Sequence, residues 1–284
     1  MKDYLNELVE QSQNLGLYEK EYHSFIHDVE ELKYFYDNIL QPLEKNEIYF
    51  LSLSARNKYL STEEREELGL GRTEMFERTI IRERTWEKFL KKVRSYERNK
   101  ESFLTKKGFA IPSKCITIYF NVNPSNVLKA YNEFSKTMND YFMELGMNAS
   151  KGGDIDNISD RIKKMDVLLM NCFQKNAGTK HYIDIDFDIP KTEIRIVELF
   201  LNDVKSRNPE TKYFVIDTKS GFHVLLERNS IRYNFNESIG KAMQYAVDLG
   251  LDEKDDHFEI VNNKNLMIPL PGTLQGGYPV RVIR

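Results

Sequence analysis

The sequence contains few cysteines and no grouping of the residues that usually bind zinc. Its two cysteines, Cys115 and Cys172, stand in apolar surroundings, which is typical of reduced core thiols in a reducing compartment. The five histidines are scattered along the chain. This usage argues against a structural zinc site and against a disulfide-stapled fold.

The chain also has no apolar run of the length of a membrane helix, and no apolar block of a signal peptide at its N-terminus. Its formal net charge is only −3, so any nucleic-acid contact must come from local clustering of cations. We therefore expect a cytoplasmic protein. The 284 residues, 40% of them hydrophobic, are enough for one large domain or two small ones.

Helical and strand patterns alternate and predict an α+β fold of two packed modules without a long linker. Ser61 and Glu64 form a capping box for a short helix that ends near Gly69. His23 and His27 are one turn apart in a predicted helix, where we interpret them as surface residues. Helices are expected within 1–47 and over 73–99, 125–145, 158–173, 190–204 and 237–249, and strands over 48–53, 114–121, 182–188, 213–218, 222–227, 258–261, 266–270 and 278–283.

The segment 180–190 is the most informative stretch, because apolar and acidic residues alternate along it. Period-two alternation predicts a strand with Asp184, Asp186 and Asp188 on one face and apolar side chains on the other. Carboxylates this close raise one another's pKa unless a cation lies among them. Two Mg²⁺ or Mn²⁺ ions would suit the face, and a solvent-facing acidic edge strand is the alternative. We interpret Asp188 as a helix-side cap before Pro190, with a supporting role behind the metal ligands as the alternative.

Two strand-like runs follow, separated only by Lys219-Ser220-Gly221, and they predict a β-hairpin with a tight turn. Lys219, Ser220, Gly221 and His223 would form a phosphate cradle from a cation, a hydroxyl, bare backbone and an imidazole. An acidic strand followed by a basic hairpin suits nucleotidyl transfer. Asp217, on the first strand of the hairpin, is interpreted as structural.

At these residues the sequence resembles the archaeo-eukaryotic primase superfamily, which contains primases and primase-polymerases. Its Asp-x-Asp strand motif is matched by Asp184-Ile185-Asp186, and its small-x-His motif by Gly221-Phe222-His223. Its Pro-Gly-Ser/Thr turn is matched by Pro271-Gly272-Thr273. The resemblance covers roughly 114–282. It implies an N-terminal helical accessory region with one strand over 1–110, and a catalytic core over 111–284, in which an αβ module packs on an RRM-like module.

The sequence departs from the family pattern around the third acidic motif. Asp256 has the best spacing for the third metal carboxylate, with Asp255 and Glu259 as alternatives. The family's cation before the Pro-Gly turn is missing, and Lys264 or Arg281 would replace it. The zinc-binding element of many members and the His after the turn are also missing. The resemblance is therefore closer to the phage and plasmid primase-polymerases than to the cellular replicative primase.

The resemblance implies a DNA primase or primase-polymerase that joins nucleoside triphosphates on a single-stranded DNA template, with a helicase as a further partner. Asp184, Asp186 and either Asp256 or Glu259 would hold two Mg²⁺ or Mn²⁺ ions. Lys219, Ser220 and His223 would hold the triphosphate.

Cations elsewhere would contact the template. Arg56 and Lys58, together with the basic segment 73–99, are the candidates, and a solvated surface is the alternative for each. Three other functions stay open from the residues alone. They are a metal-dependent glycosyltransferase with an Asp-x-Asp motif, a metal-dependent nuclease, and a non-catalytic single-strand binder.

Overall fold

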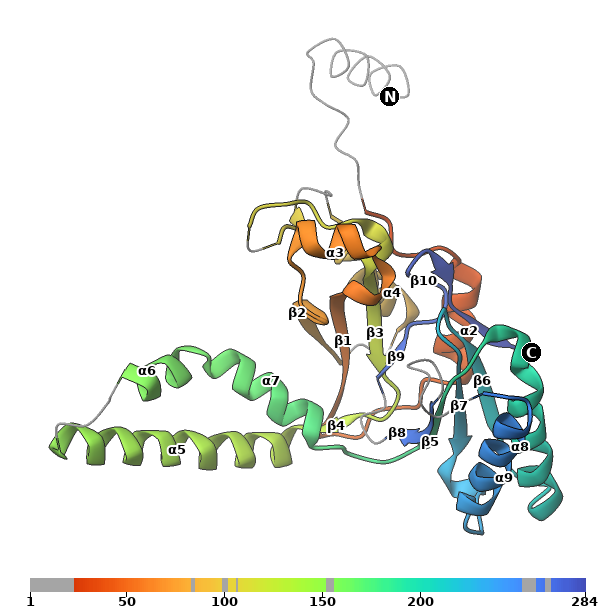
Figure 1. Ribbon diagram of the computed structural model, residues 1–284. Helices are drawn as coiled ribbons and strands as arrows, with labels where there is room; N and C mark the ends of the chain where they lie inside the picture. The colour runs from red at the N-terminus through yellow and green to blue at the C-terminus, as the bar shows by residue number, and fades with distance from the viewer. Residues whose placement is uncertain are drawn as a thin grey trace, which may run out of the picture.

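The computed structural model describes residues 23–82, 85–98, 102–105, 107–151, 156–251, 259–263 and 267–284. The chain is α+β, as expected, and is built around two antiparallel sheets (Figure 1). The first has the strand order β2–β1–β3–β9, with the short β4 paired to β1. Its strands are β1 (Glu47–Arg56), β2 (Thr73–Ile81), β3 (Ile116–Asn121), β4 (Ser125–Asn126) and β9 (Met267–Pro269).

The second sheet has the order β12–β6–β7–β5–β8, so the acidic strand β5 lies between the hairpin strand β7 and β8. Its strands are β5 (Tyr182–Asp188), β6 (Tyr213–Asp217), β7 (Phe222–Glu227), β8 (Glu259–Asn263) and β12 (Arg281–Ile283). A separate two-stranded ribbon joins β10 (Leu274–Gln275) and β11 (Tyr278–Pro279). The predicted acidic strand and hairpin are both confirmed.

Two helices, α8 (Ile194–Arg207) and α9 (Asn236–Asp248), cover one face of the second sheet (Figure 1). The odd-numbered residues of β5 form a core with them, in which Ile185 and Phe187 are fully buried. The Phe187 ring packs edge to face on Phe200 of α8, with 5.4 Å between the ring centroids. This face therefore stabilises the sheet by apolar burial.

The opposite face of the second sheet packs partly against the first sheet. Tyr182, Ile216 and Leu225 from the second sheet share one core with Leu51 and Phe120 of the first. The helices α2 (Val29–Asn38), α3 (Thr62–Leu68) and α4 (Trp86–Arg94) belong to the same half of the molecule as the first sheet (Figure 1). Strands from 1–110 and from the rest of the chain thus share one sheet and one core.

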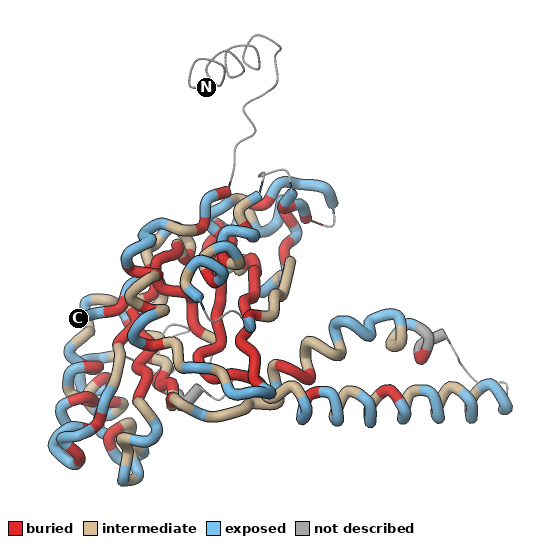
Figure 2. Tube along the Cα trace, turned by 180° about the vertical axis from the view of Figure 1, so that it is seen from behind, coloured by how far each residue is buried: buried red, intermediate tan, exposed pale blue. Residues whose placement is uncertain are grey.

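A helical arm projects from this body (Figures 1 and 2). It consists of α5 (Val127–Lys151), α6 (Asp156–Lys163) and α7 (Met165–Lys175), and α7 packs back along α5. The predicted helix over 158–173 is thus divided at Lys164. No helix in the described part of the chain has both the length and the apolar character needed to cross a membrane.

The expectation of one basic helix over 73–99 was wrong. Residues Thr73–Ile81 form β2, which pairs antiparallel with β1, and only Trp86–Arg94 are helical. Charged residues four apart suggested helical pairing, but Thr73, Thr79, Ile80 and Ile81 are β-branched and fit a pleated strand better. Pairing with β1 decides the structure, and it removes the predicted continuous basic surface.

The interpretation of His23 and His27 as neighbours on a helix was also wrong, because both precede α2. The His23 side chain is buried and stacks on Phe25, with 5.8 Å between the ring centroids. The capping box at Ser61 and Glu64 is confirmed, and α3 ends at Gly69 in a left-handed conformation. The predicted helix within 1–22 lies outside the described residues.

Candidate active site

The even-numbered face of β5 changes character along the strand. Tyr182 belongs to the shared core, whereas Asp184, Asp186 and Asp188 follow at every second position. Same-face neighbours on a strand lie about 7 Å apart. The Asp184 side chain is fully buried, while 36% of the Asp186 side chain is exposed. The strand therefore carries its carboxylates from the interior of the molecule out to a surface recess.

His223 of β7 lies directly across from Asp186 in the sheet register. Its Nδ1 atom is 3.1 Å from both carboxylate oxygens of Asp184 and 3.7 Å from Oδ1 of Asp186. The hairpin thus places an imidazole between two carboxylates that are themselves fixed by the strand. A buried carboxylate needs such a charged partner, because desolvation of an unpaired charge is costly.

The pKa values of this cluster reflect an excess of negative charge. Burial lowers the pKa of His223, but the carboxylates of Asp184 and Asp186 outweigh it and raise that pKa to about 9. Nδ1 of the resulting imidazolium donates to Asp184. Burial, with the charges of Asp184 and Asp188, raises the pKa of Asp186 to about 6 despite the opposing charge of His223. One protonated histidine does not neutralise three carboxylates, so the cluster would favour a bound cation.

A basic pocket of about 770 Å³ adjoins the acidic cluster. Asp188 belongs to both. The 3₁₀ turn Lys191–Glu193 has Pro190 at its N-cap and no side-chain cap hydrogen bond, so the interpretation of Asp188 as a helix cap was wrong. The volume is in the range of small-molecule sites. The cations that line the pocket are Arg56, Lys58, Arg65, Arg72, Lys191 and Lys219.

Lys58 is the cation that links the pocket to the acidic cluster. Burial and the neighbouring Arg56 and Arg72 lower its pKa, and the carboxylates of Asp188 and Asp186 oppose that shift. The Lys58 ammonium group therefore lies in the field of both the acidic strand and the other cations. Such an arrangement would hold a polyanion at one end and a divalent cation at the other.

Protein contacts hold several pocket cations in place. Nη1 of Arg56 donates to the Tyr119 hydroxyl over 3.2 Å, and Nζ of Lys219 donates to the Gly276 carbonyl over 2.7 Å. The Lys219 ammonium also lies 4.8 Å from the centroid of the Tyr59 ring. Ser220 lines the same pocket. The structure thus brings Lys219, Ser220 and His223 to one end of β5.

The structure shows why position 221 is occupied by glycine, which the sequence did not reveal. A Cβ atom at this position would come within 1.9 Å of the Phe187 carbonyl oxygen, so β7 begins too close to β5 for any side chain. The Gly221 carbonyl accepts a hydrogen bond of 2.9 Å from Lys191, which also pairs with Asp217. The absence of a side chain at Gly221 therefore allows β7 and β5 to approach each other closely. Asp217 is structural, as interpreted.

The predicted third carboxylates and one predicted cation cannot be placed. Asp255, Asp256 and Lys264 lie outside the described residues. Only the backbone of Glu259 is described, and its Cα pairs with that of Asp188. Within the described ranges, no group of three or more His, Cys, Asp or Glu side chains could hold a metal ion. The described part supplies two strand carboxylates, and hard oxygen donors of this kind fit Mg²⁺ or Mn²⁺.

Arg281, the other predicted replacement cation, is not brought to the cluster. On the edge strand β12 its Cα pairs in register with that of Asp217. Asp217 pairs in turn with Phe222, and Phe222 pairs with Phe187. Directly paired residues share a face of the sheet, so Arg281 lies on the face opposite Asp186.

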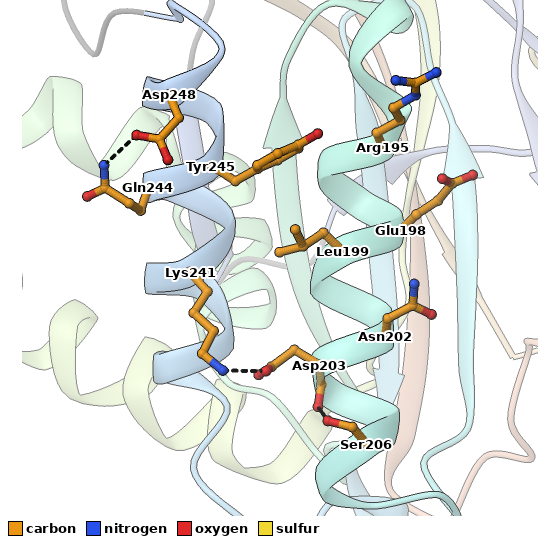
Figure 3. Close-up of a pocket in the computed structure, with 10 residues that line it drawn as sticks. All are labelled: Arg195, Glu198, Leu199, Asn202, Asp203, Ser206, Lys241, Gln244, Tyr245 and Asp248. Atoms are coloured by element: carbon orange, nitrogen blue, oxygen red, sulfur yellow. Dashed lines mark hydrogen bonds and ion pairs between the residues drawn. The ribbon is translucent and has the colours of Figure 1, made fainter.

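Another hollow, of about 690 Å³, lies between α8 and α9 (Figure 3). Several of its polar side chains bond to one another: Lys241 pairs with Asp203 over 2.6 Å, and Gln244 donates to Asp248 over 2.9 Å. It is on the helical side of the second sheet, away from Asp184 and Asp186. We therefore place the candidate active site at the acidic cluster and the basic pocket.

Comparisons with protein-family models, curated proteins and solved structures found no match. The site must therefore be interpreted from its own geometry.

Sequence reasoning missed Arg65 and Lys191 as residues of the pocket, and it counted Arg72 only among the cations of the basic segment. Lys191 had a signal, since it follows the acidic strand directly after Pro190. Arg65 and Arg72 had none, because only the packing of α3 and the following turn beside Asn57 brings them there. The backbone N–H of Asn57 donates to the Arg72 carbonyl over 3.4 Å, and Nε of Arg65 donates to the Asn57 carbonyl over 3.0 Å.

Proposed function

We propose that the chain is a template-directed nucleotidyltransferase of the primase or primase-polymerase type. One observation carries the proposal: a cluster of strand carboxylates opens directly into a pocket lined by six cations. A nucleoside triphosphate with its metal ions matches both parts. Its phosphates would bind the cations, and the metal ions that its phosphates carry would bind the carboxylates. Two antiparallel sheets that share one core are compatible with the α+β core that the resemblance implies.

Each part of the site has a role in this proposal. Asp184 and Asp186 would hold Mg²⁺ or Mn²⁺, and the bound ions would activate a 3′-hydroxyl and stabilise the leaving pyrophosphate. Arg56, Lys58 and Lys219 would bind the triphosphate and offset the charge that develops in the transition state. The third carboxylate would come from Asp256 or Glu259.

The role of His223 differs from the expectation of a phosphate ligand. Its Nδ1 is engaged by Asp184, and only 9% of its side chain is exposed. It would hold the buried carboxylate of Asp184 in its orientation, as a positioning residue. Direct contact with phosphate falls to the lysines and arginines of the basic pocket.

The opposite charges of the acidic cluster and the basic pocket also favour a nucleotidyltransferase over the three other functions considered from the sequence. A glycosyltransferase or nuclease would use the carboxylates but has less need of a pocket with six cations. A single-strand binder would use the cations but has no need of the buried carboxylate of Asp184, because a buried charge is costly. The proposed template is single-stranded DNA.

Incorporation of labelled nucleotides on circular single-stranded DNA tests the proposal, with Mg²⁺ or Mn²⁺ and with or without a primer. Asp184→Asn removes a proposed cation ligand and keeps the shape of the side chain. Asp203→Asn, on the helical side of the second sheet, is the matched control. We expect products from the wild type and from the control, and none from Asp184→Asn.

Two results would contradict the proposal. Equal incorporation by Asp184→Asn would remove the carboxylates from the reaction. DNA binding without incorporation by the wild type, under all of these conditions, would favour the non-catalytic binder.

A further inference from the structure

A second, smaller hollow lies where α7 of the helical arm meets the first sheet, and we call it the arm pocket. Its volume is about 110 Å³, well below the range of whole-nucleotide sites but enough for one tetrahedral anion. Its polar lining is cationic or neutral, and none of its described lining residues is acidic. The residues that carry its charge and amides are Arg78, Lys175, Lys180, Asn121, Asn123 and Gln174.

Arg78 is the most unusual member of this set. It stands on β2 with its Cα paired to that of Ser52, and it is half-buried. Its Nη1 donates to the Asn171 amide oxygen of α7 over 2.8 Å, and the described residues give it no carboxylate partner. A guanidinium group with five N–H donors is thus partly removed from water and bonded to one neutral acceptor. An anion in the pocket would supply the missing charge.

Lys175 and Lys180 add two more cations at the same place. Both side chains are exposed, and neither forms an ion pair with any described residue. The half-buried guanidinium can therefore bind an anion in the pocket, while the two exposed ammonium groups add positive charge from the solvent side. Arginine suits a phosphate in this geometry because its planar fork binds two oxygens at once.

The position of the arm pocket relates it to the candidate active site. Asn123 lines the arm pocket and fixes the start of β5, because its Oδ1 accepts from the N–H groups of His181 and Tyr182 over 2.8 and 2.9 Å. The other end of β5 is Asp188, which lines the basic pocket. Asp184 and Asp186 lie between these two ends.

Strand β1 of the first sheet independently places the arm pocket and the basic pocket near each other. Ser52 lines the arm pocket and Arg56 lines the basic pocket, four residues apart on β1. Their separation along the strand is about 14 Å. The two cationic pockets therefore flank the carboxylates, within a few nucleotide lengths of each other.

We propose that the arm pocket is a second phosphate-binding site. It would take one phosphate group of the nucleic acid or nucleotide that lies across the carboxylates from the basic pocket. The identity of the ligand as a nucleotide unit rests on the proposed function, whereas the affinity of the pocket for phosphate does not. The base and sugar would lie outside, since the pocket has room for the phosphate alone.

The test compares the double variant Lys175→Gln/Lys180→Gln with Lys151→Gln/Lys164→Gln. Both remove two exposed lysines, so the change in net charge is the same. The first probe is a labelled single-stranded DNA of about 16 nucleotides, measured by fluorescence anisotropy at several salt concentrations. The second probe is a nucleoside triphosphate with Mg²⁺, measured by calorimetry.

We expect the DNA affinity of Lys175→Gln/Lys180→Gln to fall about tenfold relative to the control pair, with a salt slope smaller by about 0.7. A loss of triphosphate affinity with unchanged DNA affinity would still support a phosphate site and would assign it to a free nucleotide. If both affinities stay within about twofold of the control pair, the inference is overturned.

Arg78→Gln gives a second, independent test, at the half-buried cation. We expect the same loss as in the lysine variant, with circular dichroism and the unfolding midpoint checked first because Arg78 also bonds to the arm. Binding requires no turnover. An inactive wild type whose DNA binding still depends on these cations would therefore sink the proposed function and leave the phosphate site standing.

Discussion

On one face of the second sheet Phe187 is fully buried under α8, and on the other face Asp184 is buried to the same extent. The first residue contributes apolar area and ring packing on Phe200. The second contributes a charge that must be matched by His223. Two residues of one strand are thus equally buried but have opposite effects on the energy of the fold. Burial alone therefore does not distinguish core residues from site residues, whereas the chemical nature of the group that contacts each buried side chain does.

The comparison predicts that substitutions on the two faces fail in opposite ways. Asp184→Asn should reduce incorporation by about a thousandfold, because a cation ligand and the partner of His223 are lost together. Phe200→Ala should instead cost about 3–5 kcal/mol of unfolding free energy and keep the activity of the molecules that remain folded. Urea unfolding and incorporation assays on both variants would measure this. If both variants lost stability and activity in the same proportion, the two faces of the sheet would not differ in their roles.

Gly221→Ala tests the contact between the two strands that carry the cluster. Its Cβ would overlap the Phe187 carbonyl, so we expect a loss of about 3 kcal/mol or more in stability. Gly240→Ala, where a Cβ meets nothing within 4 Å, is the matched control and should be neutral or stabilising. Thermal unfolding would measure both. A Gly221 variant as stable as the control would contradict the close strand approach.

Lys58→Gln tests the link between the acidic cluster and the basic pocket. It should raise the apparent KM for nucleotide about tenfold, since one charge contact to the triphosphate is lost. Lys205→Gln is the control, because Lys205 lies over the Tyr213 ring, outside the pocket. Steady-state kinetics on a primed template would show the difference. Equal KM values for the two variants would remove Lys58 from nucleotide binding.

The smallest expected effect concerns pH. The pKa of Asp186 is raised to about 6, so the folded state holds a proton that the unfolded state releases above its ordinary value near pH 4. Its contribution to stability therefore falls as pH rises from about 4 to 6. Without metal, Asp186→Asn should unfold a few degrees higher than the wild type at pH 7 and at the same temperature at pH 4.

His223 behaves in the opposite direction along the pH scale. Its raised pKa means that its pairing with Asp184 stabilises the fold fully below about pH 6.5, and this stabilisation is lost as pH rises through 9. Incorporation at limiting nucleotide should fall below about pH 6, as Asp186 is protonated. Unfolding midpoints and initial rates across pH 4–10 would check both directions. A flat profile of midpoints would contradict the charged cluster.

Local sequence signals predicted the parts of the site that depend on one strand or one turn. The alternation over 182–188 gave the acidic face, and the short Gly-containing turn gave the hairpin that sets His223 across from Asp186. The helix over 73–99 was wrong because pairing with β1 outweighed the helical spacing of its charges. Arg281 was proposed to replace the family's missing cation, but it lies on the sheet face opposite Asp186, because its register partner is Asp217.

The basic pocket could not be predicted as a whole. Its cations come from the end of β1, the 3₁₀ turn Asn57–Tyr59, α3, the turn before β2, the 3₁₀ turn Lys191–Glu193 and the hairpin turn, and only tertiary packing brings these together. Arg65 is an example: its helix was predicted from a capping box, but nothing local shows that its guanidinium turns back to the Asn57 carbonyl.

A crystal structure of the chain with Mn²⁺ and a non-hydrolysable nucleoside triphosphate would test the central claim most directly. The account predicts anomalous density beside the carboxylates of Asp184 and Asp186, with the triphosphate contacting Arg56, Lys58 and Lys219. Manganese and nucleotide bound elsewhere, for example in the hollow between α8 and α9, would contradict it.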